Sequence, residues 1–92
     1  MAFAKIKHRG LKEVFIKGRS SRIGYQYQAN ATRILDFLDV IHELEDCNGY
    51  RDFHSLKGNR KGQYAMSVSG NYRIVFTYRD GDVTIEDFAD YH

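Results

Sequence analysis

Residues 72–88 read YRIVFTYRDGDVTIEDF, and this segment predicts a β-hairpin. Its first half alternates in the manner of a half-buried strand. The Asp80-Gly81 pair favours a tight turn between two antiparallel strands. In the returning strand, Val83 and Ile85 keep the alternation and Phe88 breaks it, which indicates a β-bulge. One face of the first strand then carries Ile74, Phe76 and Tyr78, and the other carries Arg73, Val75 and Thr77.

Segments before the hairpin extend it into a sheet. Residues 64–68 alternate large and small side chains and predict a third strand that completes an antiparallel meander. Residues 53–56 form a shorter strand candidate, and residues 3–6 alternate as a first strand would. The sequence leaves open whether that first strand pairs inside the sheet or at its edge.

Two helices are expected between the first strand and the rest. Leu11, Val14 and Phe15 share one face of a short helix that Gly18 is placed to end. A longer helix is expected from about Tyr27 to about Leu44. Its apolar stripe contains Ala31, Ile34, Leu35, Leu38, Ile41 and Leu44. The predicted order is β-α-α-β-β-β-β, an α+β fold with helices packed on a mostly antiparallel sheet.

Size and composition set the class of protein. A chain of 92 residues forms one domain, residues 1–92, and 42% hydrophobic with 28% charged residues is a globular composition. There is no apolar run of the length of a membrane span and no secretory signal at the N-terminus. The single cysteine, Cys47, excludes an internal disulfide and a zinc site built on cysteine pairs. We therefore expect a cytoplasmic protein that does not enter a membrane.

Charge is segregated along the chain although the net charge is only +2. Residues 1–25 carry seven Lys/Arg and one acid, and residues 57–79 carry five Lys/Arg and no acid. If these stretches meet in the fold, they form one face that suits a polyanion such as RNA; the alternative is that they only solubilise the surface. The candidates for RNA or ribosome binding are Lys5, Lys7, Lys12, Lys17, Arg19, Arg22, Arg60 and Lys61.

Common catalytic motifs are absent from the sequence. It has no phosphate-binding glycine loop, no HExxH and no GxSxG. Cys47 follows Asp46, and an acidic neighbour raises the pKa of a thiol, so Cys47 is a poor nucleophile. The four histidines are too scattered for a metal motif, and we expect neither a metal nor a cofactor.

Three short segments contain better candidates for catalytic residues. His54 and Lys57 stand three residues apart, Arg73 lies near the start of a strand, and Asp90-Tyr91-His92 closes the sequence. Phosphodiester cleavage needs such groups: an acid, a base, fixed cations and an aromatic platform for a base. Each also has an ordinary explanation, as a structural histidine, a solvated arginine and a frayed end. The residues alone leave both explanations open.

The same segments carry a family resemblance. His54-Ser55-Leu56-Lys57-Gly58, Val68-Ser69-Gly70-Asn71-Tyr72-Arg73-Ile74 and the final Asp90-Tyr91-His92 resemble motifs of HigB-type toxins. These toxins belong to the RelE/ParE superfamily of bacterial type II toxin–antitoxin systems. Further matching stretches span nearly the whole chain in the same order, at residues 7–11, 33–36, 60–64, 80–82 and 87–92.

The resemblance implies a RelE-like fold, with two N-terminal helices packed on a twisted sheet. It implies a ribosome-dependent endoribonuclease that cuts mRNA in the ribosomal A site without a metal. Its partner would be a HigA-like helix-turn-helix antitoxin, and DNA would be bound only through their complex. Carried over by position, the catalytic residues are His54, Asp90, Tyr91 and His92, with Lys57 and Arg73 at the scissile phosphate.

Three positions depart from the family pattern. Ser55 stands where proline is frequent, which loosens the loop before Lys57, and Tyr64 and Tyr72 stand where tryptophan is common. None of the proposed catalytic groups is lost. Two other functions stay open from the sequence: a ParE-like inhibitor of DNA gyrase, and a non-catalytic A-site binder. ParE-type relatives lack the pattern of His54 and a terminal histidine, which favours cleavage.

Overall fold

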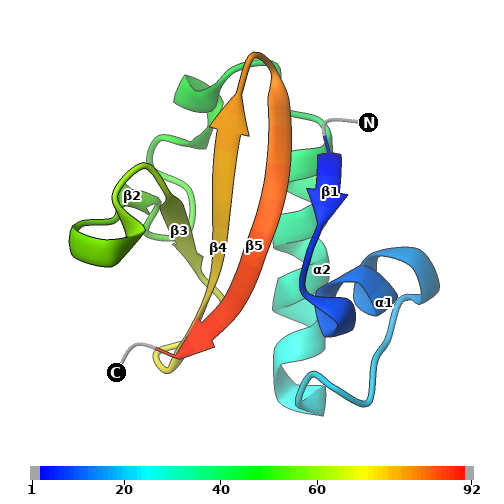
Figure 1. Ribbon diagram of the computed structural model, residues 1–92. Helices are drawn as coiled ribbons and strands as arrows, with labels where there is room; N and C mark the ends of the chain where they lie inside the picture. The colour runs from blue at the N-terminus through cyan, green and yellow to red at the C-terminus, as the bar shows by residue number, and fades with distance from the viewer. Residues whose placement is uncertain (1–2, 91–92) are drawn as a thin grey trace.

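The computed structural model describes residues 3–90, and Figure 1 shows its elements in chain order. The observed order of helices and strands confirms the prediction of β-α-α-β-β-β-β. Two short 3₁₀ helices, η1 and η2, lie in the connections. The bounds are β1 Phe3–Ile6, α1 Arg9–Lys17, α2 Tyr25–Asp39, η1 Leu44–Cys47, β2 His54–Ser55, η2 Gly58–Arg60, β3 Tyr64–Ser67, β4 Tyr72–Arg79 and β5 Asp82–Asp90.

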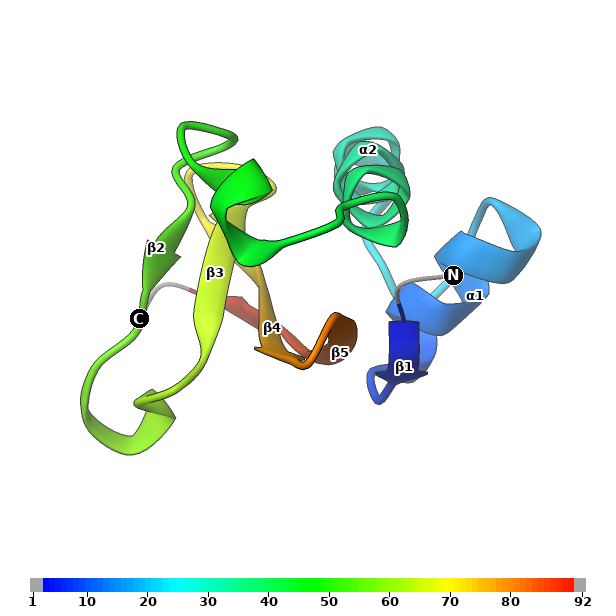
Figure 2. The ribbon, with the colours of Figure 1, turned by 90° about the horizontal axis from the view of Figure 1, so that it is seen from above.

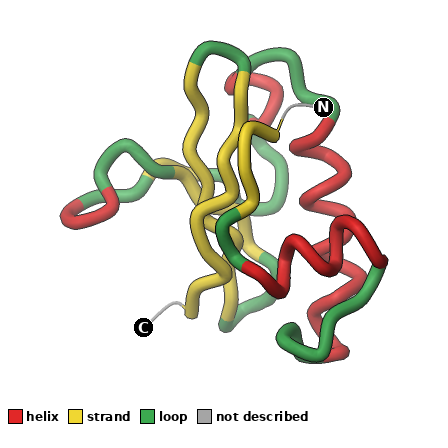
Figure 3. The backbone as a smooth tube through the Cα atoms, turned by 45° about the vertical axis from the view of Figure 1, so that its right-hand side comes forward, coloured by secondary structure: helices red, strands yellow, loops and turns green. Residues whose placement is uncertain are grey.

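The five strands form one sheet in the order β1-β5-β4-β3-β2, as Figure 3 shows in yellow. β1 runs parallel to β5 at one edge, and the other three pairings are antiparallel. The mostly antiparallel sheet is thus confirmed, and the first strand lies at its edge. β2 is shorter than the strand predicted over 53–56, because the N–H of Phe53 donates to Tyr50 in a turn and is lost to the ladder.

The hairpin of β4 and β5 contains the expected irregularity. Val75 pairs with Asp87 and Phe76 pairs with Ile85, so Glu86 is the extra residue of a bulge in β5. The break in alternation at Phe88 therefore originates two residues earlier. Past the bulge, Phe88 is in register with Ile74 and returns to the apolar side of the sheet.

Helix α1 begins and ends with identifiable caps. The Nδ1 atom of His8 accepts a hydrogen bond of 3.2 Å from the N–H of Leu11. At the other end Gly18 has a φ of 82°, and its N–H donates to Val14 at 2.8 Å. A left-handed residue at this position suits glycine, so the predicted helix end is confirmed.

Helix α2 ends at Asp39, well before the predicted end at about Leu44. A separate capping arrangement explains the difference. One carboxylate oxygen of Asp46 accepts from the backbone N–H groups of His42 and Glu43, at 2.8 and 3.1 Å. These two bonds hold the pKa of Asp46 below its usual range and start η1 instead of another helical turn.

The core lies between the helices and one face of the sheet. Ala31, Ile34, Leu35 and Leu38 of the stripe predicted for the second helix are buried there, and so is Ile41, which follows the helix end. Leu44, the last residue of the predicted stripe, is half-buried in η1. Figure 2 shows α2 lying across this face. We call it the helix-covered face and the opposite side the open face. Buried residues of the core include Leu11, Val14, Ile34, Leu35, Leu38, Ile74, Phe76, Val83 and Ile85.

None of the helices within residues 3–90 combines the length and apolar character that crossing a membrane would need.

Candidate active site on the open face of the sheet

Strand register brings two of the predicted catalytic residues to the open face. His54 of β2 pairs with Ala65 of β3, and two residues along, Ser67 of β3 pairs with Arg73 of β4. Residues two apart on a strand share a face, and so do paired residues. His54 and Arg73 therefore lie on the same side of the sheet, two strand spacings apart across it and two residues apart along it, which is about 12 Å between their backbones.

The ring of His54 is held by a backbone carbonyl. Its Nδ1 lies 2.7 Å from the carbonyl oxygen of Asp52. A carbonyl can only accept, so Nδ1 carries a proton and donates it. This leaves Nε2 for a ligand, as an acceptor when the ring is neutral and as a donor when it is protonated. His54 is half-buried, and the bond to the carbonyl of Asp52 orients its ring.

A small apolar cluster seats the loop that carries Lys57. Leu56 packs with Ala65, Val75 and Ala89 on the open face and is 9% exposed. Its N–H donates to Gln63 at 2.9 Å, which closes the loop between them. Lys57 follows Leu56 directly and is exposed. The loop is thus anchored at its base despite the serine at 55, which is itself paired with Tyr64.

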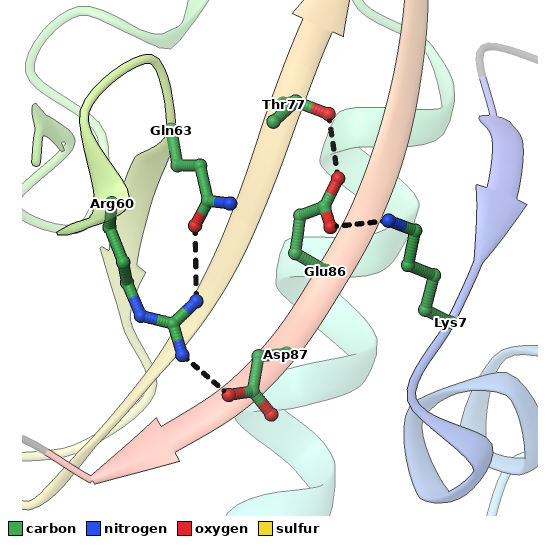
Figure 4. Close-up of polar contacts among 6 residues, drawn as sticks. All are labelled: Lys7, Arg60, Gln63, Thr77, Glu86 and Asp87. Atoms are coloured by element: carbon green, nitrogen blue, oxygen red, sulfur yellow. Dashed lines mark hydrogen bonds and ion pairs between the residues drawn. The ribbon is translucent and has the colours of Figure 1, made fainter.

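Arg60 fastens the far side of this loop to β5, as Figure 4 shows. Its guanidinium donates to Asp87 at 2.9 Å and to Gln63 at 3.0 Å. Asp87 faces the open side because the bulge in β5 shifts the register before it. Arg60 was predicted to bind RNA, and in the structure it holds the loop in place.

Figure 4 also shows a second ion pair, at the other flank of β5. The Nζ of Lys7 lies 2.8 Å from Glu86, whose second oxygen accepts from the hydroxyl of Thr77 at 3.0 Å. Arg22 forms a third, longer pair with Glu13 at 3.7 Å. The other cations predicted to bind RNA are exposed and form no ion pair within residues 3–90. They are Lys5, Lys12, Lys17, Arg19 and Lys61.

The two basic stretches do not meet. β1 and the Lys57 loop belong to opposite edges of the sheet, with β5 and β4 between them (Figure 1). The condition stated for one continuous basic face, that the two stretches meet in the fold, is therefore not fulfilled by these two segments, and the sequence alone does not fix the strand order that separates them. The N-terminal cations instead surround a groove of about 500 Å³ beside α1, which Lys5, Lys12, Lys17, Ile6 and Ile16 help to line.

The predicted residues at the end of the chain are only partly described. Asp90 is exposed at the end of β5 and in register with Tyr72. Tyr72 belongs to the helix-covered face, where its ring stacks on Phe88 at 4.8 Å. Tyr91 and His92 lie outside the described residues. The structure therefore brings His54 and Arg73 to the open face, with the exposed Lys57 next to Leu56, which packs there, whereas Asp90 shares the side of its register partner Tyr72.

Comparison with known proteins identifies the family. The sequence matches the HigB-like toxins, RelE-like toxins of the type II toxin-antitoxin system HigB, over residues 4–92. The endoribonuclease HigB of Proteus vulgaris is 36% identical over 88 residues, which cover 94% of this chain and 95% of that protein. This chain belongs to the HigB-like toxin family.

Solved structures agree on the fold of this HigB-like toxin. The YoeB–YefM complex from Staphylococcus aureus aligns with a TM-score of 0.65 at 16% identity, covering 100% of this chain and 99% of that one. The YoeB dimer from the same organism aligns with a TM-score of 0.58, with the same identity and coverage. The predicted RelE-like α+β fold is confirmed. As a toxin of a type II system, the protein has an antitoxin as its partner.

The sequence analysis of the HigB-like toxin did not predict two features near the site. Arg51 and Asp52 lead into His54 with left-handed backbones, at φ values of 47° and 58°, which their residue types do not signal. Asp87 lies 27 residues from its partner Arg60, so no local pattern joins them. The motif resemblance does include residue 87, and that was the available signal for a role there.

Cys47 is excluded from the chemistry, as predicted. It is fully buried, and this burial raises the pKa of its thiol to about 11, with a smaller contribution from Asp46. The direction of the shift was predicted, but its larger cause is burial. Within residues 3–90, no three His, Cys, Asp or Glu side chains gather where they would hold a metal ion.

Proposed function

We propose that this toxin is an mRNA endoribonuclease that works on the ribosome and cuts mRNA in the A site by metal-independent acid–base catalysis. The observation that carries the proposal is the arrangement of His54. Its Nδ1 is committed to the Asp52 carbonyl, its side chain is only half-buried, and Arg73 lies on the same face of the sheet. The name of the Proteus vulgaris relative supports the same activity.

In the proposed reaction, the 2′-oxygen of the RNA attacks the adjacent phosphorus, and the bond from phosphorus to the 5′-oxygen breaks. His92 or Asp90 takes the proton of the 2′-OH, and Nε2 of His54 gives a proton to the leaving 5′-oxygen. The products are a 2′,3′-cyclic phosphate and a free 5′-OH. The nucleophile is part of the RNA, so the step needs no activated water. In a variant of the same scheme the two roles are exchanged: His54 takes the proton of the 2′-OH, and His92 or Asp90 gives a proton to the leaving 5′-oxygen.

Positive charge on the open face would stabilise the transition state. Arg73 and Lys57 would contact the non-bridging phosphate oxygens, where charge builds up as the fifth bond forms. A well-placed donor at such an oxygen contributes roughly 3–4 kcal/mol. Tyr91 would stack on a base and orient the RNA.

Dependence on the ribosome follows from the shape of this site. On the open face, His54 and Arg73 stand on different strands with small apolar side chains between them. Such a site gains from a partner that holds the mRNA in a reactive geometry. Lys5, Lys12, Lys17, Arg19 and Lys61 would bind ribosomal RNA, while Lys7, Arg22 and Arg60 would have to share or break their ion pairs to do so.

The remaining partners follow from this scheme. The antitoxin would be a HigA-like helix-turn-helix protein that blocks the basic surface or the ribosome-bound position of the toxin. DNA would be bound only by the complex of the two. Since its substrate is mRNA that is held on ribosomes, the toxin would act in the cytoplasm.

The test is cleavage of mRNA in a reconstituted translation system, mapped by primer extension, with the wild type and a variant lacking His92. We expect cuts within A-site codons that require ribosomes and are lost in the variant. Cuts that persist would place the base at Asp90 rather than His92. Blocked translation without cuts would contradict cleavage and favour an A-site binder. No effect on translation would contradict the ribosomal function, and a gyrase supercoiling assay would then test the ParE-like alternative.

A further inference from the structure

We propose that Arg51 is a positioning residue that fixes the imidazole ring of His54 through the backbone of Asp52. The inference rests on the proposed function for its catalytic meaning, but its structural half can be tested without it. Arg51 and Asp52 have no part in the proposed cleavage reaction, and neither was predicted to contact RNA.

The side chain of Arg51 is tied to the end of β3 by two hydrogen bonds. Its Nε donates to the carbonyl of Ser67 at 2.8 Å, and a terminal nitrogen donates to that of Val68 at 3.1 Å. In return, the N–H of Ser67 donates to the carbonyl of Arg51 at 2.8 Å. Three bonds thus fix both the side chain and the backbone of one residue. The planar fork of arginine suits this double contact, and lysine could not reproduce it.

The backbone that these bonds hold is unusual. Arg51 and Asp52 both have positive φ values, 47° and 58°, in two consecutive residues that are not glycine. Side chains with a Cβ rarely adopt this conformation, and it persists only where the surroundings enforce it. The bonds of Arg51 to β3 provide that enforcement. Without them, the turn is expected to relax toward ordinary φ values.

The consequence for His54 is direct. The turn aims the carbonyl of Asp52 at Nδ1 of His54, at 2.7 Å, and so selects the tautomer with its proton on Nδ1. The side chain of Asp52 is exposed, and it is the backbone oxygen that makes the contact. Ser67, which receives the Arg51 fork, is also the register partner of Arg73. One side chain therefore fixes the local geometry next to both open-face residues of the proposed mechanism.

The two left-handed residues supply a matched pair of variants. Arg51→Gly relieves the backbone conformation and removes the guanidinium. Asp52→Gly relieves the same kind of conformation one residue later and keeps both the fork and the carbonyl. Arg51→Lys keeps the charge and loses the fork, and it serves as a second probe should the glycine variant unfold. Thermal unfolding of all three shows which are folded.

The first readout is the tautomer of His54, from the nitrogen-15 chemical shifts of its ring in the full-length protein at a pH where the ring is neutral. We expect the Nδ1–H form in the wild type and in Asp52→Gly. A substantial share of Nε2–H form is expected in Arg51→Gly and Arg51→Lys. A purely structural role for Arg51 would leave the tautomer unchanged in every folded variant.

The second readout is single-turnover mRNA cleavage on saturating ribosome complexes. We expect the two Arg51 variants to cleave about 10- to 100-fold more slowly, as for a small misplacement of a reacting group, and Asp52→Gly to stay near the wild type. An unchanged tautomer in folded Arg51 variants overturns the proposal, and so does a changed tautomer with a wild-type rate. A wild type that does not cleave contradicts the proposed function instead, and the tautomer comparison then still decides whether Arg51 fixes the ring.

Discussion

The helix-covered face and the open face of the sheet are built from alternate residues of the same strands, yet they contribute different properties. In β4, Ile74 and Phe76 are fully buried beneath the helices, whereas Arg73 and Thr77 point to the other side and stay partly exposed. One face buries apolar area, which is the main source of stability. The other holds a histidine, cations and ion pairs in fixed register over a small apolar cluster. Residues on the open face of a strand can therefore change without loss of the buried side chains that stabilise the fold.

Adjacent residues of β4 give the strongest test of this division. Ile74→Ala should lower the free energy of unfolding by about 2–5 kcal/mol, since it opens a cavity in the core. Arg73→Ala should change it by less than about 1 kcal/mol and slow cleavage by about 10²–10³-fold, as removal of a donor to the reacting phosphate does. Urea unfolding and single-turnover cleavage measure the two effects. A folded Arg73→Ala variant with a wild-type rate would remove Arg73 from the mechanism.

A smaller effect is expected where the Lys57 loop is fastened to the open face. Asp87→Asn keeps the shape of the side chain and weakens the pair with Arg60. Both partners are 36% exposed, so the stability loss should stay below about 1 kcal/mol. Cleavage should fall several-fold, because the loop that carries Lys57 is less well held.

Limited trypsin digestion gives an independent readout of that loop, since it contains Lys57, Arg60 and Lys61. Cutting within it should be faster in Asp87→Asn than in the wild type. Asp80→Asn is the matched control, because Asp80 lies in the hairpin turn at a φ of 52°, which asparagine tolerates. Equal digestion of all three proteins would show that the ion pair does not hold the loop.

The outer surface of α1 tests whether binding extends beyond the open face. Lys12 is exposed there and lines the groove beside β1. If it contacts a phosphate of ribosomal RNA, Lys12→Ala should reduce the slope of log K against log salt concentration by about 0.7–0.9. Ribosome binding measured at several salt concentrations gives the slope. Wild-type binding that is flat with salt would contradict electrostatic docking altogether.

The smallest effect concerns the buried thiol on the helix-covered side. The pKa of Cys47 is about 11 in the folded chain, against an ordinary value of 9.0. Between these pH values the unfolded chain releases the thiol proton and the folded chain keeps it, so stability falls as pH rises. Below about pH 9 the thiol is protonated in both states and contributes no pH dependence. Urea unfolding at pH 8 and pH 10.5 should show a smaller loss for Cys47→Ala than for the wild type, and equal losses would contradict the shift.

Local patterns in the sequence predicted the helix-covered face well. Alternation gave β4, the Asp80-Gly81 turn and β5, and the spacing of Ile34, Leu35 and Leu38 gave the buried stripe of α2. Periodicity reports burial rather than backbone hydrogen bonds, which is why the predicted helix ran past Asp39. Ile41 keeps the apolar spacing, but the carboxylate of Asp46 has by then taken over the backbone N–H groups.

The arrangement of residues on the open face could not be predicted from the sequence to the same extent, because it depends on pairing between strands that are distant in the sequence. The register that puts His54 and Arg73 on one side joins β2 to β4 through β3, and no local pattern fixes it. The same holds for the strand order that separates the two basic stretches. Arg51 and Asp52 were missed for a different reason, since a positive φ is usually signalled by glycine or asparagine.

Two histidine variants test whether the ring of His54 on the open face takes part in cleavage. His54→Gln removes the proposed acid–base group. His42→Gln is the matched control, because His42 is exposed and its hydrogen bonds within residues 3–90 are made by its backbone. The measurement is single-turnover cleavage of mRNA on programmed ribosomes. We expect a fall of about 10²–10⁴-fold for His54→Gln and none for His42→Gln. A folded His54→Gln variant that cleaves at the wild-type rate would contradict a role of the ring in cleavage.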